Sequence, residues 1–179
     1  MKTFLSILRG INVSGQKKIQ MMDLKILYEE LNFEKIMTYI QSGNVIFKND
    51  NAKGLSKQIE LKIYEKYNFK VPVIIRTSEE MQNIIKENPF LDNKDLDPNK
   101  LYFVFLEEKP GQANIDKLLK NSDGDDKFYI SGKEIYLYCA DGYGKTMLTN
   151  NYFENKLGVT ATTRNWKTTK ELAAIMFSY

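Results

Sequence analysis

The sequence predicts an α+β fold made of two tandem ferredoxin-like subdomains of βαββαβ type, with antiparallel sheets and extra C-terminal helices. The first 78 residues read as strands and helices in the order β-α-β-β-α-β. A similar order of elements recurs over residues 79–179. With 42% hydrophobic and 12% aromatic residues, a chain of 179 residues can bury a proper core. We therefore expect an N-terminal half, residues 1–78, and a C-terminal half, residues 79–179, that ends in a pair of helices.

Apolar spacing and turn residues identify the elements of the first half. The helix at 21–31 places Met21, Leu24, Leu27, Tyr28 and Leu31 on one face. The sequence SGN joins two strands as a hairpin, because Gly43 can adopt a positive φ. The expected strands and helices, in order, are residues 3–9, 21–31, 35–41, 45–49, 54–67 and 71–77. In the second helix we expect an apolar set of Leu55, Ile59, Leu61, Ile63 and Tyr64.

The second half begins with a helix for which Ser78 is the expected N-cap. A polar loop with two prolines follows at residues 88–100 and is the best candidate for a connection between subdomains. The later elements are expected to be a strand at 101–108, a helix at 112–121, hairpin strands at 127–132 and 133–140, and helices at 146–158 and 167–177. Residues 160–166 are expected to form a loop or a short strand.

Several classes of chemistry are excluded by composition. The chain has no histidine, which removes Ser-His-Asp and Cys-His mechanisms and histidine-ligated zinc. Its single cysteine, Cys139, lies in an apolar run and is expected to be a small buried residue. The acids from Asp123 to Asp126 lack the spacing of a calcium loop and are expected to form an acidic turn. We expect no metal and no cofactor, and whether the protein is an enzyme stays open.

Targeting signals are not found in the sequence. No apolar run approaches the length of a membrane span, and the N-terminus lacks the apolar core of a signal peptide. The lone cysteine also requires no oxidising compartment. We expect a cytoplasmic protein that does not contact membranes, and the sequence leaves its oligomeric state open.

Basic residues gather near both ends of the chain, although the net charge is only +3. Residues 1–22 contain four basic residues and no acid. Residues 145–170 contain five basic residues against Glu154 alone. If the two ends meet in space, they form a positive patch; the alternative is a set of separate solvated lysines.

The segment LRGINVSGQKK connects the first strand to the first helix. In α/β units such a connection gathers backbone N–H groups around anions. Gly10 and Gly15 permit a close approach, while Arg9 and two lysines supply positive charge. The alternative is a long connection that contains two turns. The segment does not match the G-x-G-x-x-G fingerprint, because Asn12 stands where the second glycine would be.

Three further segments are candidates for ligand contact. CADGYGKT resembles the end of a phosphate-binding loop, with Lys145 before a helix start, or is simply a glycine-rich turn. In TTRNW, Arg164 either pairs with protein groups or meets a ligand anion. In the hairpin, Ser42 and Asn44 fit turn chemistry, and Gln41 and Asn44 could also bond a ligand.

Four motifs together resemble the landmarks of a widespread bacterial family described as a domain of unknown function. In order, they are LRGIN, TYIQSGNVIF, GKTMLTNNYFENKLG and ATTRNW, and they extend over essentially the whole chain. The typical RGINVGG of the family has a glycine where Ser14 stands here. The resemblance implies a cytosolic α+β protein with two ferredoxin-like halves and supplies no activity. Its landmarks are mostly polar loop residues, which favours a site over packing.

Three functions are consistent with these patterns. The first is binding of a phosphorylated or otherwise anionic small molecule, with Arg9 and Arg164 as a clamp. The second is a nucleic-acid-binding module, whose affinity would fall steeply with salt. The third is a non-catalytic structural or interaction protein, in which the polar loops tie the halves together. The candidate ligand-binding residues are Arg9, Gly10, Asn12, Gly15, Lys17, Ser42, Asn44, Lys145, Arg164 and Asn165.

Overall fold

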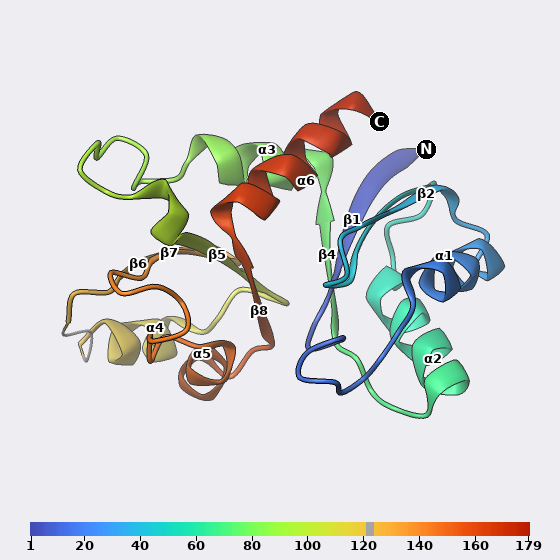
Figure 1. Cartoon of the computed structure of the whole chain (residues 1–179), viewed down its shortest axis with the longest axis horizontal. Coiled ribbons are helices and arrows are strands. Elements are labelled where there is room, and N and C mark those ends of the chain that lie inside the picture. The colour runs from blue at the N-terminus through green and yellow to red at the C-terminus, as the bar shows by residue number, and fades with distance from the viewer. Residues whose placement is uncertain (121–123) are drawn as a thin grey trace. The chain divides into compact units, whose positions relative to one another are not determined.

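The computed structural model describes residues 1–120 and 124–179 (Figure 1). The chain divides into two compact units. Unit 1 is Met1–Gln82 together with Leu172–Tyr179, and unit 2 is Asn83–Glu171. Each unit has its own four-stranded antiparallel sheet. The expected boundary after residue 78 stays a prediction.

Unit 1 confirms the order β-α-β-β-α-β. Its elements are β1 (Lys2–Leu8), α1 (Met21–Glu30), β2 (Glu34–Tyr39), β3 (Asn44–Asn49), α2 (Leu55–Tyr67) and β4 (Val73–Thr77). The strands are arranged β2-β3-β1-β4, so the first strand lies inside the sheet. Both helices cover the same face of this sheet (Figure 1).

The core of unit 1 lies between that face and the two helices. Leu55, Ile59 and Ile63 of α2 are buried there at a spacing of four residues. Leu61 and Tyr64, expected on the same face, are instead 58% and 45% exposed. They lie well around the helix from the buried stripe, because each residue advances about 100°.

Unit 2 repeats this plan. Its elements are β5 (Leu101–Leu106), α4 (Gln112–Leu119), β6 (Lys127–Ser131), β7 (Glu134–Tyr138), α5 (Asn150–Leu157) and β8 (Ala161–Asn165), after the 3₁₀ turn η1 (Pro98–Lys100). The strands are arranged β6-β7-β5-β8. The segment for which a loop or a short strand was expected is therefore a strand, β8. The α5 helix begins later than expected, because the Thr149 side chain accepts a hydrogen bond from the Tyr152 amide and caps it.

A helix follows the last strand of each sheet directly: α3 (Ser78–Lys86) after β4 and α6 (Trp166–Ser178) after β8. Thr77 caps α3, and the expectation of Ser78 as its cap was wrong. The Thr77 amide donates to Glu80 Oε2 (2.8 Å) while the Glu80 amide donates to Thr77 Oγ1 (3.2 Å). This reciprocal pair is a capping box, which requires the hydroxyl three residues before the glutamate.

Three hydrogen bonds within unit 1 have counterparts at equivalent positions within unit 2. The matched pairs are Leu8 N to Gly43 O (2.8 Å) with Leu106 N to Lys133 O (3.0 Å), Arg9 N to Pro72 O (2.9 Å) with Glu107 N to Thr160 O (2.9 Å), and Val73 N to Glu60 Oε1 (2.8 Å) with Ala161 N to Glu154 Oε1 (2.9 Å). The two units therefore repeat the same backbone geometry as well as the same order of elements.

The repeat makes unequal loops easy to identify. The connection from β1 to α1 takes residues 9–20, whereas its counterpart from β5 to α4 takes only residues 107–111. In unit 2 the enlarged connection is from β7 to α5, residues 139–149, against residues 50–54 in unit 1. We call residues 9–20 the β1–α1 loop and residues 139–149 the β7–α5 loop. Each of these two loops is therefore more than twice as long as its counterpart in the other unit.

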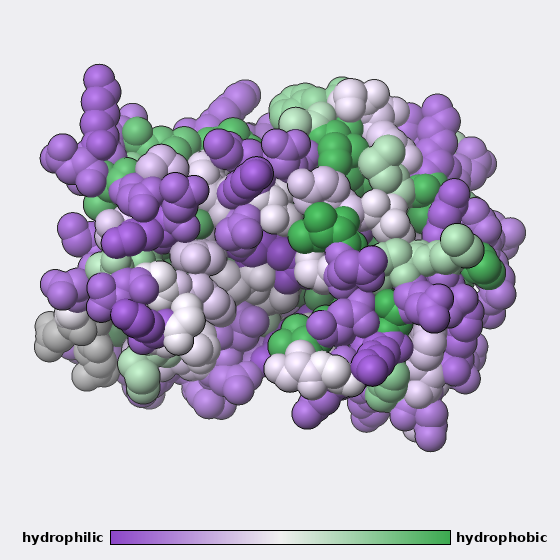
Figure 2. Space-filling model, in the orientation of Figure 1, coloured by the Kyte–Doolittle hydropathy of each residue, from purple (hydrophilic) through white to green (hydrophobic). Residues whose placement is uncertain are grey.

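Hydrophilic side chains cover most of the face seen in Figure 2, with hydrophobic side chains in separate small patches. Among residues 1–120 and 124–179, every helix is too short or too polar to cross a membrane.

Candidate functional site

The β1–α1 loop has an unusual backbone. Five of its residues have positive φ: Gly10 (71°), Asn12 (56°), Ser14 (50°), Gly15 (75°) and Lys17 (45°). Three of these are not glycine, and the left-handed region costs such residues energy. Ser14 and Gly15 are the central pair of a tight turn closed by a 3.0 Å hydrogen bond between flanking residues, which is the type I′ pattern.

Asn12 fixes this strained loop from within. Its Nδ2 donates to the carbonyls of Ile19 (3.0 Å) and Gln41 (2.8 Å), and its Oδ1 accepts from the Ile19 amide (2.9 Å). Lys17 adds a second tie, since its Nζ donates to the Lys70 carbonyl at 2.8 Å. Both side chains hold the loop in one shape, so their hydrogen bonds are structural.

The turn between β2 and β3 packs against the start of this loop. Gly43 has a φ of 74°, and a Cβ on it would lie 2.7 Å from Ile11 Cδ1 and 2.8 Å from Leu8 Cβ. The buried Asn44 side chain donates to Ser42 Oγ (2.9 Å) and to the Tyr39 carbonyl (3.2 Å). Ser42 and Asn44 therefore shape the turn, and unit 1 brings them together with the β1–α1 loop.

Positive charge and free donors remain on the outside of the loop. Arg9 is partly exposed and Lys18 is exposed. The exposed amides of Gly10, Ser14 and Gly15 donate to no other residue that the structure describes. These are the groups through which the loop could bind an anion.

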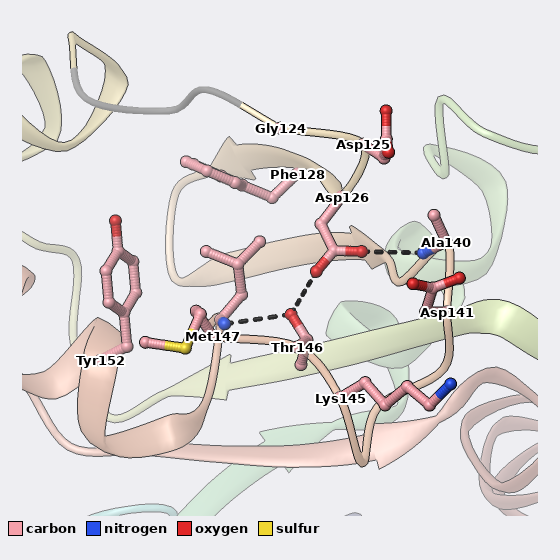
Figure 3. Close-up of a pocket in the computed structure, with 11 residues that line it drawn as sticks. Gly124, Asp125, Asp126, Phe128, Ala140, Asp141, Lys145, Thr146, Met147 and Tyr152 are labelled. Atoms are coloured by element: carbon pink, nitrogen blue, oxygen red, sulfur yellow. Dashed lines mark hydrogen bonds between the residues drawn. The ribbon is translucent and has the colours of Figure 1, made fainter.

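In unit 2, Lys145 lies on the β7–α5 loop beside a pocket of about 440 Å³ (Figure 3). Asp126 fixes this loop: its Oδ1 accepts from the Ala140 amide (2.8 Å), and its Oδ2 accepts from Thr146 Oγ1 (2.5 Å). Thr146 Oγ1 in turn accepts from the Leu148 amide at 3.0 Å. The hydroxyl of Thr146, the residue that follows Lys145, is thus hydrogen-bonded to a carboxylate.

The surroundings of Lys145 differ from those of a phosphate site. Asp125, Asp126 and Asp141 line the same pocket, and α5 already has its own cap. The role of Lys145 in binding an anion stays a prediction, with acidic neighbours that oppose it. Asp123 of the expected acidic turn lies outside the described residues. Within those residues, no group of three acids or cysteines is placed to hold a metal.

Cys139 is fully buried, as expected from its apolar run. Burial raises the pKa of its thiol to about 11, and the nearby Asp126 carboxylate adds to this rise. The thiol is therefore protonated at neutral pH, which is the opposite of what a nucleophile needs.

Arg164 lies in β8, where its guanidinium donates to the Thr163 carbonyl (2.9 Å) and to Thr162 Oγ1 (3.1 Å). Burial lowers the pKa of Arg164 to about 10. Asn165 caps α6, because its Oδ1 accepts from the Thr168 amide at 2.7 Å. Both residues therefore have structural bonds within unit 2, and their part in ligand binding stays a prediction.

The sequence reading missed Arg76, the counterpart of Arg164 in unit 1. Arg76 is 1% exposed, and its Nη1 donates to the Ile75 carbonyl at 2.9 Å. The sequence contained a signal for it: in Arg76-Thr77 and in Arg164-Asn165, the arginine precedes a residue whose side chain caps the next helix.

The model of a family described as "Protein of unknown function (DUF1697)" matches residues 1–136. The chain belongs to this family. The DUF1697 match includes the β1–α1 loop and the β2–β3 turn, and it ends before the β7–α5 loop. The solved structure of the conserved bacterial protein SP0830 from Streptococcus pneumoniae is similar over 99% of both chains, with a TM-score of 0.79 and 23% identity. It supports the fold alone. No curated protein matches the chain.

Proposed function

We propose that this protein binds a phosphorylated or otherwise anionic small molecule at the β1–α1 loop of unit 1. Arg9 and Lys18 supply the positive charge, and the amides of Gly10, Ser14 and Gly15 supply donors. The observation that carries the proposal is the size of the loop: residues 9–20 make a connection that unit 2 makes with residues 107–111. The repeated fold does not require the additional length.

The conformation of the loop supports the same function. Left-handed residues that are not glycine persist only where the surroundings hold them, and such strain is common at ligand sites. Asn12 and Lys17 supply that hold through their bonds to carbonyl groups. A loop already fixed in shape loses little entropy when a ligand binds, which favours affinity.

Lys145, Arg164 and Asn165 of unit 2 are also predicted to bind a ligand, and for these residues ligand binding stays a prediction. The proposal does not rest on these three residues, because Asn165 caps a helix, Arg164 donates to its own strand and Lys145 has acidic neighbours. We propose that this binding takes place in the cytoplasm, since the single cysteine requires no oxidising compartment.

Nucleic-acid binding is the less supported alternative. RNA-binding modules of this fold stack bases on aromatic side chains of the helix-free sheet face. In unit 2 that face has Phe103, Phe105 and Tyr136, which are at most 1% exposed, together with the partly exposed Tyr138 and with Tyr129 of β6, which is 52% exposed. The three buried rings are not available for stacking in this structure, so an RNA would depend on Tyr129, Tyr138 and the basic side chains.

The test is a thermal-shift screen at low salt with phosphate, nucleotides, sugar phosphates, polyphosphate and short RNA. A ligand at about a hundred times its Kd adds about 2.7 kcal/mol, which raises Tm by roughly 5–10 °C for a chain of this size. Lys18→Ala and Arg9→Ala should reduce the shift. Lys109→Ala, in the short equivalent loop of unit 2, should leave it unchanged.

Three results would count against the proposal. If no small anion shifts Tm, the structural or interaction role is favoured. If Lys18→Ala behaves like Lys109→Ala, the anion binds elsewhere. If only RNA gives a shift and salt abolishes it, the protein is a nucleic-acid-binding module. Unfolding of Arg9→Ala alone would make Arg9 structural, and Lys18→Ala would still test the site.

A further inference from the structure

The pocket in unit 2 has two chemically different sides. It has a volume of about 440 Å³, within the range of small-molecule sites. Figure 3 shows Phe128, Met147 and Tyr152 on one side and the carboxylates of Asp125 and Asp141 on the other. A ligand that fits this lining has an apolar body and a cationic end.

The walls of the pocket are held in place. The β7–α5 loop, which forms much of the lining, is longer than its counterpart in unit 1 and is bonded to Asp126 at two points. Phe128 and Tyr152 each pack edge-to-face on Phe153, with ring centroids 5.7 Å and 5.6 Å apart. The aromatic side therefore has a fixed shape that an apolar group can occupy.

The polar side has unused negative charge. Both oxygens of Asp126 already accept hydrogen bonds, so this carboxylate is part of the wall. Asp125 and Asp141 are exposed, and neither makes a hydrogen bond or an ion pair with any residue in the described ranges. The lining has three carboxylates against the single ammonium of Lys145, so it favours a cation.

We propose that this pocket binds an organic ammonium ion. The apolar body of the ligand lies against Phe128 and Tyr152, and its ammonium group meets the carboxylates of Asp125 and Asp141. The proposal concerns a second site, with a ligand of opposite charge to that of the β1–α1 loop, and it does not depend on that site.

The probe is the phenethylammonium ion, titrated into the whole protein and followed by amide chemical shifts. The amides of Gly124, Lys145 and Tyr152 should shift. The neutral isostere 2-phenylethanol should bind more weakly, and 3-phenylpropionate should not bind. Asp125→Asn and Asp141→Asn should each weaken binding roughly three- to fivefold, the loss expected for a solvated ion pair. Asp92→Asn, at an exposed acid outside the lining, should have no effect.

All these aspartates are exposed, so the variants should fold like the parent protein. If those three amides do not shift at saturating millimolar probe, the pocket does not bind ammonium ions and the proposal is wrong. It is also wrong if 3-phenylpropionate binds as well as the ammonium probe. If Asp125→Asn and Asp141→Asn bind the probe as tightly as Asp92→Asn does, the carboxylates are not involved.

Discussion

Gly43 combines two constraints in a single residue. Its φ of 74° lies where side chains are disfavoured, and a Cβ there would meet Ile11 and Leu8 at less than 3 Å. Gly10 has a similar φ of 71°, but a Cβ on it would meet nothing within 4 Å. A comparison of alanine substitutions at the two glycines therefore separates the energy of backbone strain from that of a steric clash.

We predict that Gly43→Ala lowers the free energy of unfolding by roughly 2–4 kcal/mol, because overpacking adds to backbone strain. Gly10→Ala should lower it by only about 1–2 kcal/mol, from strain alone. Urea denaturation measures both. Equal losses for the two variants would mean that Ile11 and Leu8 move aside, and that the β2–β3 turn does not fix the start of the β1–α1 loop.

At the scale of single residues, the sequence located the polar loops but not the roles of their side chains. Asn12 and Asn44 were candidates for ligand contact, and both donate to backbone carbonyls in the structure. The sequence does not distinguish a loop asparagine that binds a ligand from one that holds the loop in shape. In the second role its partners are backbone groups, which any residue supplies. Only the fold shows which carbonyls lie within reach.

At the scale of elements, a hydrogen bond between Tyr28 Oη and Ser6 Oγ (2.7 Å) joins α1 to β1 inside the core. Burial raises the pKa of Tyr28 well above its usual value near 10. Since the folded state keeps this proton to higher pH than the unfolded state does, the stabilising effect is present below about pH 10 and is lost as pH rises above it.

We predict that the free energy of unfolding falls as pH rises from about 10 to 11, by at most about 1.4 kcal/mol per pH unit for this group. Tyr28→Phe should make the fall less steep and should cost about 1 kcal/mol at neutral pH for the lost hydrogen bond. Tyr64→Phe, at an exposed position of α2, is the control. An unchanged slope in Tyr28→Phe would show that other groups set the alkaline limit.

The elements that could be predicted are those with a regular apolar period. Leu24, Leu27 and Tyr28 mark α1 clearly, and all three are buried as expected. The β8 strand was less evident, because its sequence ATTRN is mostly polar and its strand geometry comes from pairing with β5. Long-range pairing of this kind leaves little local signal.

At the scale of the whole molecule, the same arrangement of strands and helices occurs twice in the chain, with different residues. Gly43 in one unit corresponds to Lys133 in the other, and Val73 corresponds to Ala161. The similarity lies in backbone hydrogen bonds, which many residues can make, so the sequence indicated a common element order without common positions. The β1–α1 and β7–α5 loops are recognised as enlarged only by comparison with the shorter connections at the equivalent places of the other unit.

Glu60 and Glu154 allow a test of whether equivalent hydrogen bonds in the two units contribute equally to the free energy of unfolding. Each carboxylate lies on the second helix of its unit and accepts from the first amide of the last strand, at 2.8 Å and 2.9 Å. A hydrogen bond to a charged group contributes about 1.5–3 kcal/mol. We predict that Glu60→Ala and Glu154→Ala lower the free energy of unfolding by similar amounts in this range.

Glu65→Ala, on the exposed face of α2, controls for the change in helix propensity and should have little effect. Hydrogen exchange then locates each loss: the Val73 amide should exchange faster in Glu60→Ala, and the Ala161 amide should exchange faster in Glu154→Ala. A large loss in one variant with almost none in the other would mean that the second bond is only a geometric coincidence. The repeat would then be a similarity of shape, with its stabilising interactions divided differently between the two units.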